Sequence, residues 1–242
     1  MSTTLNGRGR LGNQIIRNLC MSIVAEKNDL DVNYENYEKI NKLINLYKGS
    51  NIFGDMVELN EDNFFEILNL GRNSLKSNLD GHYSFFQTRI ITNFLYNYLN
   101  SICIRNQIIK KNPYKDKYNS NNDCYIHVRI GDVECWSPGI DYYTKALRLI
   151  KFDKLYISSD TLDHNIVNTL IDNYPNSEKV LRDDIDTIHF ASTCKYLILS
   201  HGSFSAIIGY LGFFSEVYYK SYDVNGSWWH GDIFSIPGWK GI

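Results

Sequence analysis

Between residues 125 and 219, short apolar runs alternate with segments in which apolar side chains recur every three to four positions. A short apolar run between polar residues is typical of a buried strand, and the longer spacing is typical of a helix. Strands separated by helices favour a parallel sheet, so we expect an α/β fold. The pattern predicts strands at 125–128, 154–157, 179–181, 196–199 and 217–219, with helices at 141–150, 166–173, 187–194 and 204–213.

The first part of the chain shows a similar but weaker pattern. A short apolar run at 3–6, a glycine-rich turn at 7–12 and a helical stripe from Leu11 to Val24 are typical of the start of a βαβ unit. The polar segment at 110–123 contains a proline and no apolar periodicity, which favours a domain boundary there. We therefore expect two domains, 1–120 and 121–242. Within the first domain we also expect a strand at 31–34, helices at 38–46 and 90–109, and loops with short strands at 48–82.

The composition narrows the function classes. With 43% hydrophobic and 21% charged residues among 242, the chain can bury a core. Its formal net charge of −2 is unlike that of proteins that bind phosphate backbones, so we expect no nucleic-acid partner. No signal peptide is recognisable and no apolar run approaches about 18 residues, so we expect no membrane span and a cytoplasmic protein. Five cysteines without a CxxC pair fit neither a disulfide framework nor a zinc site.

Polar side chains gather where the predicted strands end. In an open parallel sheet, ligands bind beyond the carboxyl ends of the strands, so these side chains are expected to share one cleft. The polar residues at or just after the ends of the four strands between 125 and 199 are, in chain order, His127, Arg129 and Asp132; Ser158, Ser159 and Asp160; Arg182, Asp183 and Asp184; and His201, Gly202, Ser203 and Ser205.

The residue types in this set suit a nucleoside diphosphate. The guanidinium of Arg129 is a fixed cation whose geometry matches a phosphate. Ser203 and Ser205 begin a predicted helix, where free N–H groups and hydroxyls form a second anion site. Asp160 or Asp184 could accept hydrogen bonds from a ribose or a base. Taken singly, Arg129 could instead form a surface ion pair with Asp132, and the serines could simply cap the helix.

A glycine pattern near the start supports a different function. Gly7, Gly9 and Gly12 form GxGxxG between an expected strand and a helix, and Asp29 and Asp31 follow about 20 residues later, as in dinucleotide-binding folds. An NAD-dependent oxidoreductase is therefore one alternative. It predicts that a dinucleotide binds near residues 7–12 and that the arginine at position 129 is dispensable.

Several short motifs occur in an order that resembles the fucosyltransferase superfamily, especially the α-1,2-fucosyltransferases (glycosyltransferase family 11-like). The segment GRLGNQIIR at 9–17 is similar to the family's GGLGNQMFQ, and HVRIGDV at 127–133 is similar to HxRRGDY. The remaining blocks are a tyrosine pair at 142–143, SSD at 158–160, SHGSFSAI at 200–207 and, more loosely, YSFFQ at 83–87. The chain departs from the family at Ile130, where the second arginine is expected, and at Ala206 and Ile207, where aromatic residues are expected.

The resemblance implies a GT-B-like fold: two Rossmann-like domains whose parallel sheets face a cleft. It implies an inverting transfer that needs no divalent metal and no cofactor, with a nucleotide-sugar donor, typically GDP-fucose, and a glycan hydroxyl as acceptor. Arg129 would bind the diphosphate and stabilise the leaving group. The other donor-binding residues that we expect on this basis are Gly12, Asn13, Gln14, His127, Ser159, Asp160, Asp184, Ser203, Phe204 and Ser205.

The general base is the least defined part of the site. Inversion requires that the acceptor hydroxyl lose its proton as it attacks. Asp132 is the first candidate because it follows Gly131 at the strand end, Glu134 is the second, and His127 is a third. Three alternatives remain open: a transferase for another GDP- or UDP-sugar, a non-catalytic nucleotide-sugar-binding module, and a metal hydrolase built on His127, Asp132 and Asp160. The sequence leaves the acceptor, the linkage and the oligomeric state open.

Overall fold

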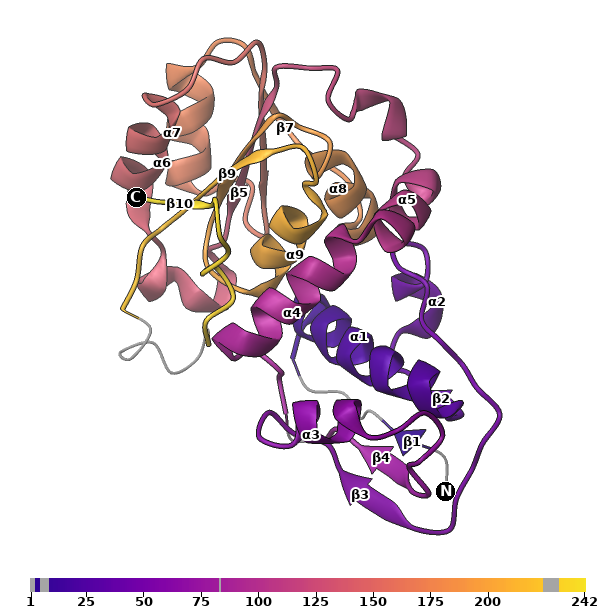
Figure 1. Cartoon of the computed structure of the whole chain (residues 1–242). Coiled ribbons are helices and arrows are strands. Elements are labelled where there is room, and N and C mark those ends of the chain that lie inside the picture. Colours follow the sequence, from indigo (N-terminus) through magenta and orange to yellow (C-terminus); the bar gives the residue numbers. More distant parts are fainter. Residues whose placement is uncertain (1–2, 5–8, 83, 224–230) are drawn as a thin grey trace.

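The computed structural model describes residues 3–4, 9–82, 84–223 and 231–242, and it contains two separate parallel sheets (Figure 1). The larger sheet has the strand order β10-β9-β8-β5-β6-β7, and every neighbouring pair is parallel. The predicted α/β fold with a parallel sheet is therefore confirmed. Its strands are β5 (Cys124–Val128), β6 (Leu155–Ser159), β7 (Ser177–Lys179), β8 (Tyr196–Leu199), β9 (Glu216–Tyr219) and β10 (Lys240–Gly241).

The central strand β5 is buried along its whole length, because helices cover both faces of the sheet. Its side chains alternate between two apolar clusters: Tyr125 packs in one, whereas Ile126 and Val128 pack in the other. The helices that cover this sheet are α6 (Gly139–Leu147), α7 (Asn165–Asn173), α8 (Asp184–Ala191) and α9 (Ser203–Leu211), and a 3₁₀ segment, η2 (Gly131–Trp136), follows β5. The helices begin one to three residues before their predicted starts.

The smaller sheet has the order β2-β1-β4-β3, again with parallel pairs only. The long helix α1 (Leu11–Asn28) follows β1 and is buried over most of its length. The strands are β1 (Thr3–Thr4), β2 (Val32–Asn33), β3 (Met56–Glu58) and β4 (Asn78–Asp80), and this half of the chain also contains two short helices, α2 (Tyr37–Ile40) and α3 (Phe64–Asn69).

Three predictions for this part were wrong. The helix expected at 38–46 stops at Ile40, and a helix, α3, forms within 48–82, where only loops and strands were expected. The single helix expected at 90–109 is two helices, α4 (Arg89–Asn100) and α5 (Ile102–Lys111). Ser101 separates them because its backbone is extended (ψ 142°) and its hydroxyl donates to the Tyr98 carbonyl at 2.7 Å.

Helices α1 and α4 lie between the two sheets in Figure 1. The apolar cluster that contains the buried face of α1 continues into α8 and α9, so the two sheets share one core. Tyr96 of α4 contacts Tyr210 of α9 and Trp239 edge-on, with ring centroids 6.1 Å apart in each pair. All strands of the smaller sheet precede residue 120 in the sequence, and all strands of the larger sheet follow it. The division into two independent domains stays a prediction. The polar segment after α5 carries only a short 3₁₀ turn, η1 (Lys115–Lys117).

Candidate functional site

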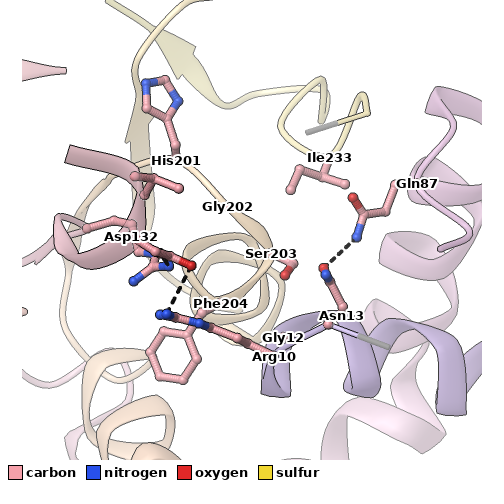
Figure 2. Close-up of a pocket in the computed structure, with 13 residues that line it drawn as sticks. Arg10, Gly12, Asn13, Gln87, Asp132, His201, Gly202, Ser203, Phe204 and Ile233 are labelled. Carbon is pink, nitrogen blue, oxygen red and sulfur yellow. Dashed lines mark hydrogen bonds and ion pairs between the residues drawn. The ribbon is translucent and has the colours of Figure 1, made fainter. Parts of the chain in front are cut away.

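The first turns of α1 and α9 lie against each other, and Gly12 makes this possible. A Cβ atom on Gly12 would lie 2.4 Å from the backbone nitrogen of Phe204 and 2.5 Å from the carbonyl carbon of Ser203. Those backbone atoms cannot move aside as a flexible side chain could, so only glycine allows this approach. The contact brings Asn13 and Ser203, 190 residues apart in the sequence, to the wall of one cavity (Figure 2).

Two cavities lie side by side at this place, and they share the side chains of Arg10, Arg129 and Phe204. The smaller cavity has a volume of about 260 Å³ and the larger about 490 Å³. The smaller one is also lined by Gly9, Gly12, Asn13, Gln87, Asp132, Val133, His201, Gly202, Ser203 and Ile233. The larger one is also lined by Leu11, Gln14, Asn36, Lys39, His127, Ser158, Ser159, Asp160, Val180, Arg182, Asp184 and Thr187.

Two arginines and two aspartates meet where the cavities join. The Arg129 guanidinium contacts both Asp132 and Asp160. Arg10 adds a second guanidinium, 3.0 Å from an oxygen of Asp132 and 3.7 Å from one of Asp160 (Figure 2). Burial, followed by the positive charge of Arg10, lowers the pKa of Arg129 from its ordinary value. A guanidinium nevertheless stays charged in proteins, so the junction holds two fixed cations.

Asp160 has a structural role in addition to its contact with arginine. Its other oxygen accepts the backbone N–H of Ile130 at 2.9 Å. Gly131 follows with a φ of +30°, and a Cβ there would lie 2.4 Å from the Asp160 carboxylate. Asp160 therefore holds the turn after β5, and glycine is required for the turn to pass so close to it.

His127 and Ser205 form a buried pair behind the cavities. They are 5% and 0% exposed, and Nδ1 of His127 lies 2.5 Å from the Ser205 hydroxyl. Burial, followed by the charge of Arg129, lowers the pKa of His127 to about 3, so the imidazole is neutral at physiological pH. His127 touches the larger cavity, whereas Ser205 lines neither cavity and its hydroxyl already has a partner. Of the two predicted serines at the start of α9, Ser203 is the one that lines a cavity.

Besides Arg129 and His127, four more of the predicted donor-binding residues line the larger cavity with defined partners. Ser159 accepts the N–H of Thr161 at 3.0 Å, and Asp160 is held as described above. Asp184 accepts a hydrogen bond from Lys39 at 2.8 Å, across the boundary between the two halves. The Gln14 amide donates to the Gly9 carbonyl and to Glu35, each at 3.0 Å, and accepts from Asn36 at 2.7 Å.

The smaller cavity is lined mainly by neutral groups. Gln87 donates to the Asn13 side chain at 2.8 Å, which presents two amides on one wall (Figure 2). On another wall, burial and then the charge of Lys220 lower the pKa of His201 to about 4, so this imidazole is also neutral at pH 7. Asp132 supplies the cavity's carboxylate. Glu134 points elsewhere: it lies 3.2 Å from His164 and lines neither cavity.

Sequence reasoning missed several of the residues that complete the site. Arg10 lies within the glycine-rich turn at 7–12, but nothing in the sequence placed it beside Arg129. Gln87 fell within the loosely matched YSFFQ segment, of which Tyr83 lies outside the described residues. His201 and Arg182 were noted at strand ends without an assigned role. Lys39, Asn36 and Ile233 come from segments that carry no motif at all.

The remaining sequence predictions concern metals, dinucleotides and membranes. Over the described residues, no group of three or more His, Cys, Asp or Glu is placed to hold a metal ion. Gly7 of the GxGxxG pattern lies outside the described part of the chain, and Asp29 ends α1, where Tyr47 and Ser50 donate to its carboxylate at 2.6 and 2.8 Å. No helix in the portion that the structure describes is long and apolar enough to cross a bilayer.

Comparison with models of known protein families found no match, and comparison with curated protein sequences found none either.

Proposed function

We propose that the protein is an inverting, metal-independent glycosyltransferase of GT-B-like architecture that uses a nucleotide-sugar donor, most simply GDP-fucose, and transfers the sugar to a hydroxyl of a glycan. The observation that supports this most strongly is the pair of arginines at the junction of two cavities, beyond the carboxyl ends of parallel strands. A nucleotide sugar has the same layout, with a diphosphate between a nucleoside and a sugar. A cytoplasmic location belongs to this proposal.

The diphosphate fits best beside Arg10, Arg129 and Ser203. Guanidinium groups bind phosphate oxygens in pairs of hydrogen bonds, and the N-terminus of α9 offers free N–H groups with the positive end of the helix dipole. The larger cavity, at about 490 Å³, lies within the usual range for small-ligand sites and suits the nucleoside. Its Asp184 and Lys39 supply an acceptor and a donor for a base or a ribose. The smaller cavity is left for the sugar and the acceptor.

This arrangement accounts for the chemistry of the leaving group. As the bond between the anomeric carbon and the diphosphate oxygen breaks, negative charge builds up on the diphosphate. Two fixed guanidiniums and the helix N–H groups stabilise that charge without reorganising, which is the largest contribution to catalysis in many enzymes. Arg10 also compensates for Ile130, which stands where the related family carries its second arginine and which is buried here.

Asp132 is the better candidate for the general base. Its carboxylate lines the smaller cavity, whereas Glu134 lies outside both cavities. His127 is 5% exposed, its Nδ1 is bonded to Ser205, and it touches only the larger cavity, away from the smaller one where the acceptor is placed. In the proposed reaction, Asp132 takes the acceptor proton while the acceptor oxygen bonds to the anomeric carbon from the face opposite the departing diphosphate.

The dinucleotide alternative is less consistent with the geometry. In that motif the backbone of the second glycine, here Gly9, approaches the pyrophosphate closely. Here the Asn13 side chain occupies the space beside Gly9, where a Cβ would lie 2.4 Å from its amide nitrogen.

A thermal-shift panel tests the proposal. GDP, UDP, ADP, CMP and NAD would each be added, with and without magnesium, to the wild type and to Arg129→Ala. A ligand that binds only the native state raises the melting temperature. We expect a shift of several degrees with GDP, independent of magnesium and absent in Arg129→Ala. A shift with UDP alone would keep the transferase but replace the donor. A shift with NAD that persists in Arg129→Ala would reject the proposal.

A further inference from the structure

We propose that Asp132 occupies the diphosphate site in the ligand-free protein, and that the donor displaces it and thereby frees it to act on the acceptor. The inference rests on the proposed function and goes further: it assigns an order in which the donor must bind before the acceptor can react. It depends on the contacts that Asp132 and Asp160 make at the junction of the two cavities.

Both oxygens of Asp132 are engaged by arginine. Oδ1 contacts Arg129, and Oδ2 lies 3.0 Å from a terminal nitrogen of Arg10. While these contacts last, each oxygen directs one of its two lone pairs at a guanidinium, so a substrate hydroxyl must compete with the arginines for this carboxylate. The ligand-free arrangement therefore places the best candidate base in a position where the arginines already engage it.

The same contacts place two carboxylates where a diphosphate would bind Arg129. Of the terminal nitrogens of Arg129, Nη2 faces Asp132 and Nη1 faces Asp160. A guanidinium has five N–H donors, but a diphosphate that uses this one would lie beside both carboxylates, and repulsion between the like charges favours the departure of one of them. Binding is therefore an exchange of one anion for another.

The two aspartates differ in how firmly they are held. Asp160 stands at the end of β6, its side chain is 26% exposed, and it accepts the Ile130 N–H in addition to its arginine contact. Asp132 lies on the 3₁₀ segment η2, its side chain is 55% exposed, and among the residues that the structure describes its carboxylate contacts the two arginines alone. An exposed carboxylate without a backbone anchor costs less to displace, so Asp132 is the one that leaves.

The position of Asp132 gives the exchange a chemical consequence. Asp132 lines the smaller cavity, where the acceptor is expected, whereas Asp160 lines the larger one. Once the diphosphate has taken the arginines, the freed Asp132 carboxylate accepts the proton of the acceptor hydroxyl. The acceptor oxygen forms its bond to the anomeric carbon, and the diphosphate leaves with the electron pair of the broken bond. The proton is thus transferred to Asp132, and the charge on the leaving group is met by Arg10 and Arg129.

Calorimetric titration of GDP and of inorganic pyrophosphate tests the exchange directly. Asp132→Asn removes the competing charge with little change in shape, so we expect it to bind both ligands at least fivefold more tightly than the wild type. Asp163→Asn is the matched control, because this carboxylate follows the same strand as Asp160 but is fully exposed and 3.6 Å from Lys179, away from the arginines. We expect its affinity to stay within twofold of the wild type.

A second readout separates displacement from simple charge repulsion. Trp136 lies on η2, four residues after Asp132, so its fluorescence reports on that segment. We expect pyrophosphate to change the emission of the wild type, and we expect ligand-free Asp132→Asn to show the changed emission already. Trp136→Phe identifies the part of the signal that comes from this residue.

The outcomes distinguish this inference from the proposed function. If the wild type binds GDP and Asp132→Asn binds it no more tightly, the exchange is wrong and the proposed function stands. If Asp132→Asn binds GDP and the wild type does not, the exchange is supported. If neither protein binds GDP or pyrophosphate, both proposals fall. Tighter binding without any difference in Trp136 emission would also overturn the exchange, since repulsion alone would then explain the gain.

Discussion

At the scale of single residues, the environment decides what each candidate can do. His127 and Arg129 are two positions apart on the same segment, yet one is enclosed and neutral and the other reaches two cavities. The sequence indicated both as polar residues at the end of a strand. It could not show that His127 faces Ser205 inside the protein, because a motif carries no information on which neighbour fills the space around a side chain.

Buried His127 and half-buried His201 predict how stability depends on pH. The pKa is lowered to about 3 for His127 and about 4 for His201, below the value of about 6.5 expected in the unfolded chain. Between these values the unfolded chain binds more protons than the folded one, so the free energy of unfolding falls as the pH drops below about 6.5. For His127 alone, the loss between pH 7 and pH 5 is about 2 kcal/mol.

Urea unfolding at pH 7 and pH 5 measures this loss in the wild type and in His127→Gln, in which an amide replaces the imidazole opposite Ser205. We expect the variant to lose about 2 kcal/mol less stability than the wild type between the two pH values. Equal losses in both proteins would show that His127 is accessible to protons in the native state, which contradicts its enclosure.

At the scale of helices and strands, predictions from a clear apolar periodicity were accurate, whereas predictions from a weak periodicity were not. Strands β5, β6, β8 and β9 and helices α6 to α9 were predicted because each carries its own apolar run or stripe. Strand β7 begins two residues before its predicted start, and β10 was not predicted. Helix α3 was missed because six residues are too few for a helical period to show. The break at Ser101 was missed because the apolar stripe continues across it, and only the backbone at that residue reveals the turn.

The close packing of α1 against α9 at Gly12 predicts how one added methyl group at that position changes the stability of the fold. We expect Gly12→Ala to destabilise the fold by about 1–3 kcal/mol, because the added Cβ would meet the backbone of Ser203 and Phe204 at about 2.5 Å. Alanine's better helix propensity, worth about 1 kcal/mol, offsets only part of this. Chemical denaturation measures the difference. Gly54→Ala is the matched control, because nothing lies within 4 Å of a Cβ at that position, and it should unfold near the wild-type midpoint. A Gly12→Ala variant as stable as this control would contradict the close approach of the two helices.

At the scale of the whole molecule, the site belongs to neither half alone. Arg10, Asn13 and Gln14 come from the start of α1, whereas Arg129, Asp160 and Ser203 come from the larger sheet and α9. The apolar core likewise continues from α1 into α9. The sequence showed that polar residues would gather at the carboxyl ends of the strands. It could not show that Arg10 would meet Arg129, because that contact depends on how the two sheets are packed together.

The central claim is that the paired arginines stabilise a diphosphate leaving group while its sugar is transferred with inversion. Proton NMR of GDP-fucose incubated with the protein tests this, with water standing in for the acceptor. We expect release of GDP together with fucose that first appears in the anomeric configuration opposite to that of the donor, at a rate reduced about 100-fold or more in Arg129→Ala. Release of fucose with retained configuration, an equal rate in Arg129→Ala, or binding of GDP-fucose without any release of GDP would contradict the claim.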